Sequence, residues 1–356
     1  KQVDAILEAE PANLVALRSK AEILAKQGKA TELEAVLTQL EEASPETGMG
    51  AFGKGRLYQQ QKKFPEALAA YEEALKREPD SVLGLTGLVN TYLAMGDPDG
   101  AIKRLTTVLE ADSEHPAAHY LLGESYMAKQ DYVNAEREFT RQLEVNANSS
   151  TVHTKVAVAR AQQGNQAGAE TALLQGLEVL PEDVQLKQAL VALYTQQGEL
   201  DKAAAVYQKA MDSSPDEPRF VLGLAAIQER QQQYDAAIAT YESFLVKNPE
   251  NVIATNNLAA LLADHRTDEA SLNKAKELAV KLAATNQPAL LDTLGWVHYR
   301  LGEYDQAAEI LSGVVEKAPD VPVFRYHLGM TYYKQGDMRA ARKILSEAVA
   351  DDMKYE

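Results

Sequence analysis

Small residues recur along the chain at two fixed points of a 34-residue period. Counted from residues 14, 48, 82, 116, 150, 184, 218, 252, 288 and 322, the twentieth position is alanine in eight of the ten windows, and in the window from residue 252 the matching alanine, Ala275, comes four residues later. The eighth position is small or short in every window, and positions eleven and twenty-four are often aromatic or leucine. Small residues let two helices cross closely, and the larger side chains fill the space between neighbouring pairs. The pattern predicts a stack of about ten helical hairpins.

Turn residues follow the same period. Prolines stand at Pro11, Pro45, Pro79, Pro181, Pro215 and Pro249, while Ser113 and Ala147 occupy the two beats at which proline is missing. Each proline ends a second helix, and glycines between the two helices of a hairpin supply left-handed caps. The stretch from Leu262 to Ala275 is about four residues longer than the other turns, so we expect a longer, exposed loop there.

Two segments, Tyr120–Phe139 and Thr293–Leu311, closely match the pattern W-x2-L-G-x2-Y, then A-x3-F, then proline at position thirty-two. This pattern resembles the tetratricopeptide repeat, and the resemblance covers residues 14 to 355. It implies an all-α, right-handed superhelical α-solenoid of about ten helix-turn-helix hairpins, continuous over residues 14–356, whose first helices line a concave wall. Residues 1–13 are predicted to be the remnant second helix of a preceding repeat. Since the chain lacks an initiator Met, we expect it to be part of a longer one.

The charge of the chain narrows the possible partners. Its formal net charge is −16, from 36 basic and 52 acidic residues. Such a surface repels phosphate backbones and anionic lipid, so we expect no nucleic-acid binding and no docking on acidic membranes. No apolar stretch reaches the length of a membrane span. Cysteine is absent, which excludes disulfides, zinc–thiolate sites and cysteine nucleophiles.

The residues that carry catalytic chemistry form no recognisable constellation. His119 and His153 share position four of neighbouring repeats and could face each other, but no carboxylate accompanies them at ligand spacing. We therefore predict that they pack rather than bind metal. Phosphate-binding glycine loops and G-x-S-x-G elbows are missing as well. We expect neither enzyme activity nor a cofactor in this chain, although a catalytic domain elsewhere in a parent chain stays open.

In tetratricopeptide arrays the concave wall is built mainly from positions 2, 5, 9, 12 and 13 of each first helix. The C-terminal repeats place there Asp292, Trp296, Tyr299, Arg300, Tyr326, Met330, Tyr333 and Lys334. Aromatic residues and arginine dominate binding hot spots, so this patch is the first candidate, suited to an apolar segment that carries a carboxylate. A second candidate patch comprises Phe52, Arg56, Asn90, Tyr120, Glu124 and Met127. The alternative for the C-terminal patch is that the last repeats bury its side chains against a missing cap or a neighbouring subunit.

Two known binding modes of the family are not supported. The carboxylate clamp needs a basic residue at position five and asparagine at position nine of one repeat. Arg18 is the only base at position five, and Glu22 follows it at position nine; Asn90 follows Thr86. The asparagine ladder of the O-linked N-acetylglucosamine transferase type is missing too, since Asn257 stands alone at position six.

A narrower resemblance concerns residues 289–349. They look like the C-terminal repeats of bacterial envelope lipoproteins associated with exosortase and exopolysaccharide loci. The resemblance implies a scaffold of the bacterial periplasm or cell envelope that binds a protein or peptide in its groove. The alternatives are a cytosolic regulatory adaptor and a non-catalytic arm of an enzyme such as a glycosyltransferase. The ends of the array could also join copies into a homo-oligomer.

Overall fold

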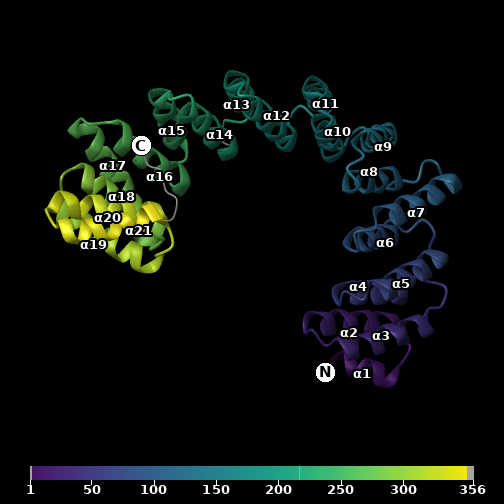
Figure 1. Cartoon of the computed structure of the whole chain (residues 1–356). Coiled ribbons are helices and arrows are strands. Elements are labelled where there is room, and N and C mark those ends of the chain that lie inside the picture. The colour runs from purple at the N-terminus through teal and green to yellow at the C-terminus, as the bar shows by residue number, and fades with distance from the viewer. Residues whose placement is uncertain (1, 216, 351–356) are drawn as a thin grey trace. The chain divides into compact units, whose positions relative to one another are not determined.

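The computed structural model describes residues 2–215 and 217–350, and all regular structure in these residues is helical (Figure 1). The first helix is α1 (Gln2–Ala9). The helices that follow it form hairpins, in order α2 (Leu14–Lys26) and α3 (Ala30–Ala43), α4 (Met49–Gln60) and α5 (Phe64–Arg77), α6 (Val82–Ala94) and α7 (Pro98–Ala111), α8 (Ala118–Ala128) and α9 (Tyr132–Val145), α10 (Ser150–Gln162) and α11 (Gln166–Val179), α12 (Val184–Gln197) and α13 (Leu200–Ser213), α14 (Pro218–Arg230) and α15 (Tyr234–Lys247), α16 (Val252–His265) and α17 (Glu269–Leu282), α18 (Pro288–Arg300) and α19 (Tyr304–Lys317), α20 (Pro322–Gln335) and α21 (Met338–Ala350). The predicted all-α solenoid is confirmed.

The helices group into two compact units, residues 1–190 and residues 191–356, and the division falls within α12. Within the first unit α1 packs on α2, and hairpins such as α4–α5 and α8–α9 pack in chain order. Within the second unit the pairs α18–α19 and α20–α21 do the same. The assignment of residues 1–13 to a preceding repeat stays a prediction. No helix of the described residues is long and apolar enough to cross a membrane.

The helix crossings explain the two columns of small residues. The alanines of position twenty, such as Ala135 and Ala203, are fully buried. The residue at position twenty-four packs onto position eight of its own repeat: a Cβ on Gly123 would lie 2.5 Å from the Phe139 ring, and one on Gly55 would lie 2.7 Å from Tyr71. Larger residues at position eight of these hairpins would have to push the rings out of the core.

The turns inside the hairpins use left-handed backbone at one residue. Glycine provides it at six turns, for example Gly164 with φ 79°, whereas Lys62, Gln130 and Gln232 adopt positive φ without being glycine. The hairpin α16–α17 lacks such a residue. Its cap residue Arg266 is extended, with φ −120° and ψ 148°.

The prediction of a longer loop between Leu262 and Ala275 is wrong. α16 runs to His265 and α17 begins at Glu269, so three residues connect them, as in the hairpin α14–α15. The Asp268 carboxylate accepts from the Ser271 backbone N–H at 2.8 Å and starts α17 early. The additional residues of this repeat are accommodated in α16, which is one residue longer than α14, and at the start of α17, which begins six residues before Ala275, whereas α15 begins three residues before Ala237; the 3-10 helix η1 (Ala283–Thr285) follows α17.

Two buried histidines hold the loops at which proline is missing. His119 Nε2 lies 3.1 Å from the Ser113 carbonyl oxygen, and His153 Nε2 lies 3.1 Å from the Ala147 carbonyl oxygen. Both side chains therefore pack, as predicted. The expectation that no carboxylate accompanies them is wrong for His119, because Glu138 Oε2 lies 2.8 Å from its Nδ1. Glu138 lies on α9, the second helix of the same hairpin. It follows His119 by 19 residues, so a search for ligands at short spacing along the chain does not include it.

If the histidine stabilises this loop in place of the missing proline, a proline introduced there should compensate for loss of the histidine. We expect His153→Ala to lower the free energy of unfolding by about 1–3 kcal/mol, from the lost bond and the space left behind. Ala147→Pro should restore part of it, since Asn146 is already extended (φ −144°, ψ 93°), as a residue before proline must be. Urea unfolding of the four proteins of this double-mutant cycle provides the measurement. An equal gain from Ala147→Pro in both backgrounds would show that the two devices are unrelated.

Candidate functional site

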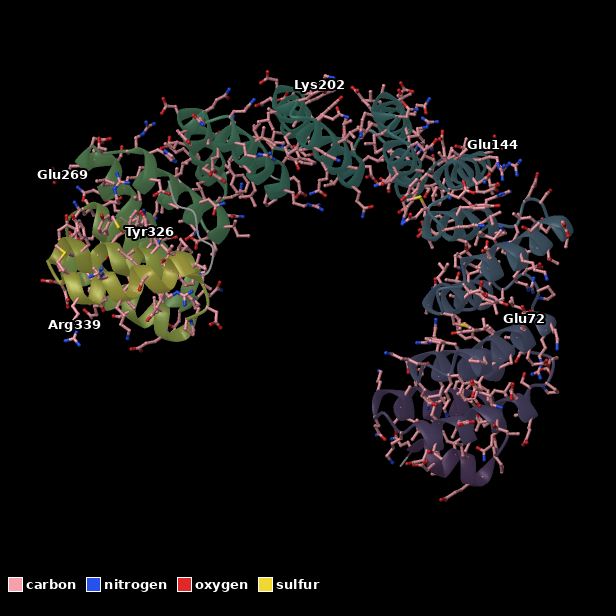
Figure 2. All side chains as sticks on the ribbon, viewed as in Figure 1. Glu72, Glu144, Lys202, Glu269, Tyr326 and Arg339 are labelled. Atoms are coloured by element: carbon pink, nitrogen blue, oxygen red, sulfur yellow. The ribbon has the colours of Figure 1, made fainter. Side chains whose placement is uncertain are left out.

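The candidate site lies on the first helices of the last three hairpins, α16, α18 and α20, which pack on one another within the second unit. Its centre is Trp296 on α18. The indole stacks on Tyr299 one helical turn later, with ring centroids 4.5 Å apart and planes 10° apart. It also stacks on His327 of α20, with ring centroids 4.1 Å apart and planes 20° apart. The Tyr326 ring is tilted against the indole, with a centroid distance of 6.3 Å. These four residues are called the aromatic cluster below; Figure 2 shows Tyr326 among the side chains of the C-terminal helices.

Polar contacts fix the cluster in place. Trp296 Nε1 donates a 2.7 Å hydrogen bond to the Asp264 carboxylate near the end of α16. The Nδ1 atom of His327 lies 2.9 Å from the carboxylate of Asp292, which is only 6% exposed. Asp292 thus orients a ring of the cluster instead of presenting its charge to a ligand.

Arg300 donates hydrogen bonds to the C-terminal end of α16. Its guanidinium donates to the carbonyl oxygens of Asp264 and Arg266, each at 3.2 Å. This helix end has no left-handed cap residue, so its last carbonyls need other donors, and Arg300 supplies them. The guanidinium is thereby tied to the preceding repeat.

Glu303, just beyond α18, supports the same helix from its turn. Its carboxylate accepts from Lys276 Nζ at 2.8 Å and lies 2.5 Å from His298 Nδ1. The hydrogen bond from Lys276 is the main cause that lowers the pKa of Glu303 below its ordinary 4.5. The ionised Glu303 carboxylate therefore stabilises the folded state at pH values above 4.5, and this contribution is lost as the pH falls through the lowered pKa.

The other predicted residues of this patch point outward to different degrees. Tyr333 is 50% exposed and Lys334 is exposed, whereas Tyr299, Tyr326 and Met330 are half-buried. Burial raises the pKa of the Tyr299 phenol, and the neighbouring phenols of Tyr304 and Tyr326 raise it further. The Tyr299 phenol therefore stays neutral at neutral pH and can donate a hydrogen bond.

The second predicted patch is less continuous. Phe52 and Tyr120 are half-buried and pack on rings below them, Tyr71 at 5.8 Å and Phe139 at 5.9 Å between centroids. The half-buried Glu124 pairs with Lys155 at 2.9 Å. Met127 is half-buried, whereas Arg56 and Asn90 are exposed.

Sequence reasoning missed His327, Asp264 and Arg266 as members of the C-terminal site. Asp264 lies 32 residues before Trp296, close to one repeat, and this spacing was the available signal. Three ligands for a metal ion do not come together anywhere in the described residues.

Family models for the tetratricopeptide repeat match residues 58–124, 92–159, 194–263 and 298–355, and a second model of that description matches residues 155–218. The chain belongs to the tetratricopeptide repeat family. Arrays of this family typically are non-catalytic scaffolds for protein–protein interaction, and membership supports that general function here. No curated protein matches the chain.

Solved structures similar to this tetratricopeptide protein share little sequence with it. One is Naa15/Naa10 bound to HypK-THB, with 19% identity over 99% of this chain and 60% of that one, and a TM-score of 0.42. MamA has 23% identity over 49% of this chain and 96% of its own, with a TM-score of 0.40. YrrB, described as a TPR protein with an unusual peptide-binding site, has 16% identity over 53% of this chain and 97% of its own, with a TM-score of 0.38. The chain spans 60% of the first of these.

Proposed function

We propose that the chain binds a segment of a partner protein on the surface formed by the aromatic cluster, Met330, Tyr333 and Lys334. The observation that carries the proposal is the pair of stacks on Trp296, at 4.1 and 4.5 Å, which order the rings before any partner arrives. Rings that are already ordered lose little conformational entropy on binding, so more of the contact energy appears as affinity. The surface provides apolar area and phenol groups together, as binding hot spots do.

The charge at this surface sets the chemistry of the segment. Lys334 makes no ion pair within the described residues, whereas Arg300 is bonded to carbonyls of α16. We therefore assign to Lys334 the role of meeting a carboxylate of the partner. The preferred occupant is an apolar or aromatic segment with one acidic group at its edge.

Site-specific cross-linking tests this proposal. A photoreactive phenylalanine at position 333 should capture one discrete protein in the native host, because the side chain lies at the exposed edge of the cluster. The same group at Arg339, an exposed residue of α21 that Figure 2 shows at the periphery, is the control. With the captured segment in hand, Tyr333→Ala should weaken binding by about tenfold or more, and Leu83→Ala, an exposed apolar residue of α6, should not. The same adducts at both positions would contradict the proposal.

We further propose that this scaffold acts in the bacterial envelope, in secretion or exopolysaccharide assembly. The support is the resemblance of residues 289–349 to repeats of envelope lipoproteins. Fractionation of cells that produce the full-length gene product tests it. Recovery in the periplasmic or membrane fraction is expected; recovery in the cytosol would favour a cytosolic regulatory adaptor. A catalytic domain in the same polypeptide would favour the arm of an enzyme.

A further inference from the structure

An open hollow of 140 Å³ lies between the first two hairpins, away from the aromatic cluster. Its apolar lining comes from α2, α3 and α4, and consists of Ala21, Ala25, Leu33, Leu37, Gly53 and Leu57. A cavity of about 150 Å³ in another protein holds a benzene molecule, so the hollow suits one leucine-sized or phenyl-sized side chain. Glu22, Arg56 and Gln60 form its polar rim.

The hollow exists because one side chain is too short for its place in the repeat. In two later repeats, the aromatic side chain at position twenty-four packs under a glycine sixteen residues further on: a Cβ on Gly87 would lie 2.5 Å from the Tyr71 ring, and one on Gly223 would lie 2.3 Å from the Tyr207 ring. In the first repeat the same pair is Leu37 and Gly53. Leucine touches the glycine but lacks the outer part of a phenol ring, so the space beyond it stays open.

This combination is specific to the first junction. The other leucines of position twenty-four are followed sixteen residues later by larger or methyl-bearing residues: Leu105 by Leu121, Leu173 by Ala189 and Leu311 by His327. Leu37 alone is followed by glycine. The first junction therefore has room for a side chain that the chain itself does not supply.

The charges around the hollow oppose the charge of the whole molecule. Arg56 is the one basic residue of the rim and Glu22 the one acidic residue. Arg18 and Lys26 do not line the hollow but lie on α2 about one helical turn before and after Glu22. All three basic residues are exposed and make no ion pair within the described residues. A local excess of positive charge on a chain of net charge −16 attracts an acidic ligand and repels a basic one. Gln60 adds an amide that can bond a peptide backbone.

We propose that this hollow, named the leucine socket, binds an acidic peptide segment by enclosing one of its aliphatic side chains, with a neighbouring carboxylate on Arg56. The proposal rests on the proposed function only in that the ligand is a polypeptide; it does not involve the aromatic cluster. The two sites lie in different units of the chain, so each can be removed without touching the other.

Fluorescence anisotropy with defined peptides tests the leucine socket. The probe is a labelled pentapeptide Asp-Glu-Leu-Glu-Asp, measured against the full chain at about 50 mM salt, where surface charges are weakly screened. Matched probes replace the leucine by alanine, or the four acids by their amides. We expect the leucine probe to bind at least about fivefold more tightly than the alanine probe, the difference expected for buried methyl groups, and the amide probe to lose binding.

Two variants identify the place of binding. Ala25→Leu puts the chain's own side chain into the socket, and Arg56→Glu reverses the charge at its rim; each should weaken binding of the leucine probe by about tenfold. The controls are Ala94→Leu and Arg230→Glu, exposed residues at the ends of α6 and α14. Ala25 is itself exposed, so its substitution does not disturb the core.

Each remaining outcome has a defined meaning. Loss through Arg56→Glu without loss through Ala25→Leu, or equal affinity of the leucine and alanine probes, would show a diffuse basic surface and overturn the socket. Binding of no probe at about 1 mM would overturn it as well. Tyr333→Ala should leave the probe's affinity unchanged; failure of the aromatic-cluster proposal alone would not alter these results.

Discussion

Replacing Ala135 by glutamate is expected to unfold the N-terminal unit. Ala135 is 0% exposed at the crossing of α8 and α9, so a longer side chain has no space and its charge has no water. A buried, unpaired carboxylate costs several kcal/mol even after the protein relaxes, which exceeds what most single substitutions do. Ala135→Leu, which adds volume without charge, should cost about 1–3 kcal/mol. Far-ultraviolet circular dichroism during urea unfolding measures both.

Ala128→Glu is the matched control, since Ala128 is exposed at the end of α8 in the same hairpin. It should unfold within about 0.5 kcal/mol of the parent. If Ala135→Glu behaved like Ala128→Glu, the alanine column would not mark helix crossings, and the repeat register that places every other residue would be wrong.

The register could be predicted from sequence because the crossings repeat the same geometry. Ala67, Ala101, Ala135 and Ala203 occupy equivalent crossings and are all fully buried, so one physical requirement leaves the same residue at each period. Gly123 and Phe139 show how this requirement links two positions of a repeat. Repetition turns a packing rule into a signal that a single sequence can display.

Contacts made once, or made by different residue types, leave no such signal. Neighbouring repeats are joined by bonds about 30 residues apart: Lys129 to Asp99, Gln231 to Asp201 and Gln335 to Asp305. The donor is lysine at one of these junctions and glutamine at the other two, so no single residue type recurs at this position of the repeat. The bonds of Arg300 to α16 depend on a hairpin turn that lacks a left-handed residue, and this occurs in one described hairpin.

The candidate site shows the same limit. Position in the repeat placed Trp296, Tyr299 and Tyr333 on the first helices, but it did not show that Asp292 is buried beneath His327 or that Arg300 is bonded to carbonyls of α16. Those facts depend on side-chain conformations in three successive repeats. They change which residues should be substituted in a binding experiment, because anchored residues also support the fold.

Trp296→Ala is accordingly expected to lower the stability of the C-terminal unit by about 2–4 kcal/mol, close to the range of large aromatic truncations in cores. The substitution removes two ring stacks and leaves the Asp264 carboxylate without its donor. Trp296→Phe keeps a ring for stacking and loses only the hydrogen bond, so it should cost about 0.5–1.5 kcal/mol. Circular dichroism during urea unfolding measures the stability of both variants. It replaces tryptophan fluorescence, because both substitutions remove the only tryptophan of the chain.

Tyr333→Ala separates support of the fold from binding. Tyr333 is 50% exposed, so its removal should leave the unfolding midpoint within error of the parent while it weakens capture of the partner segment. Equal destabilisation by Trp296→Ala and Tyr333→Ala would show that the outer tyrosine belongs to the packed interior. A Trp296→Ala protein as stable as the parent would show that the stacks on Tyr299 and His327 contribute nothing to folding. In that case the order of the cluster, which carries the proposed function, would have no energetic basis.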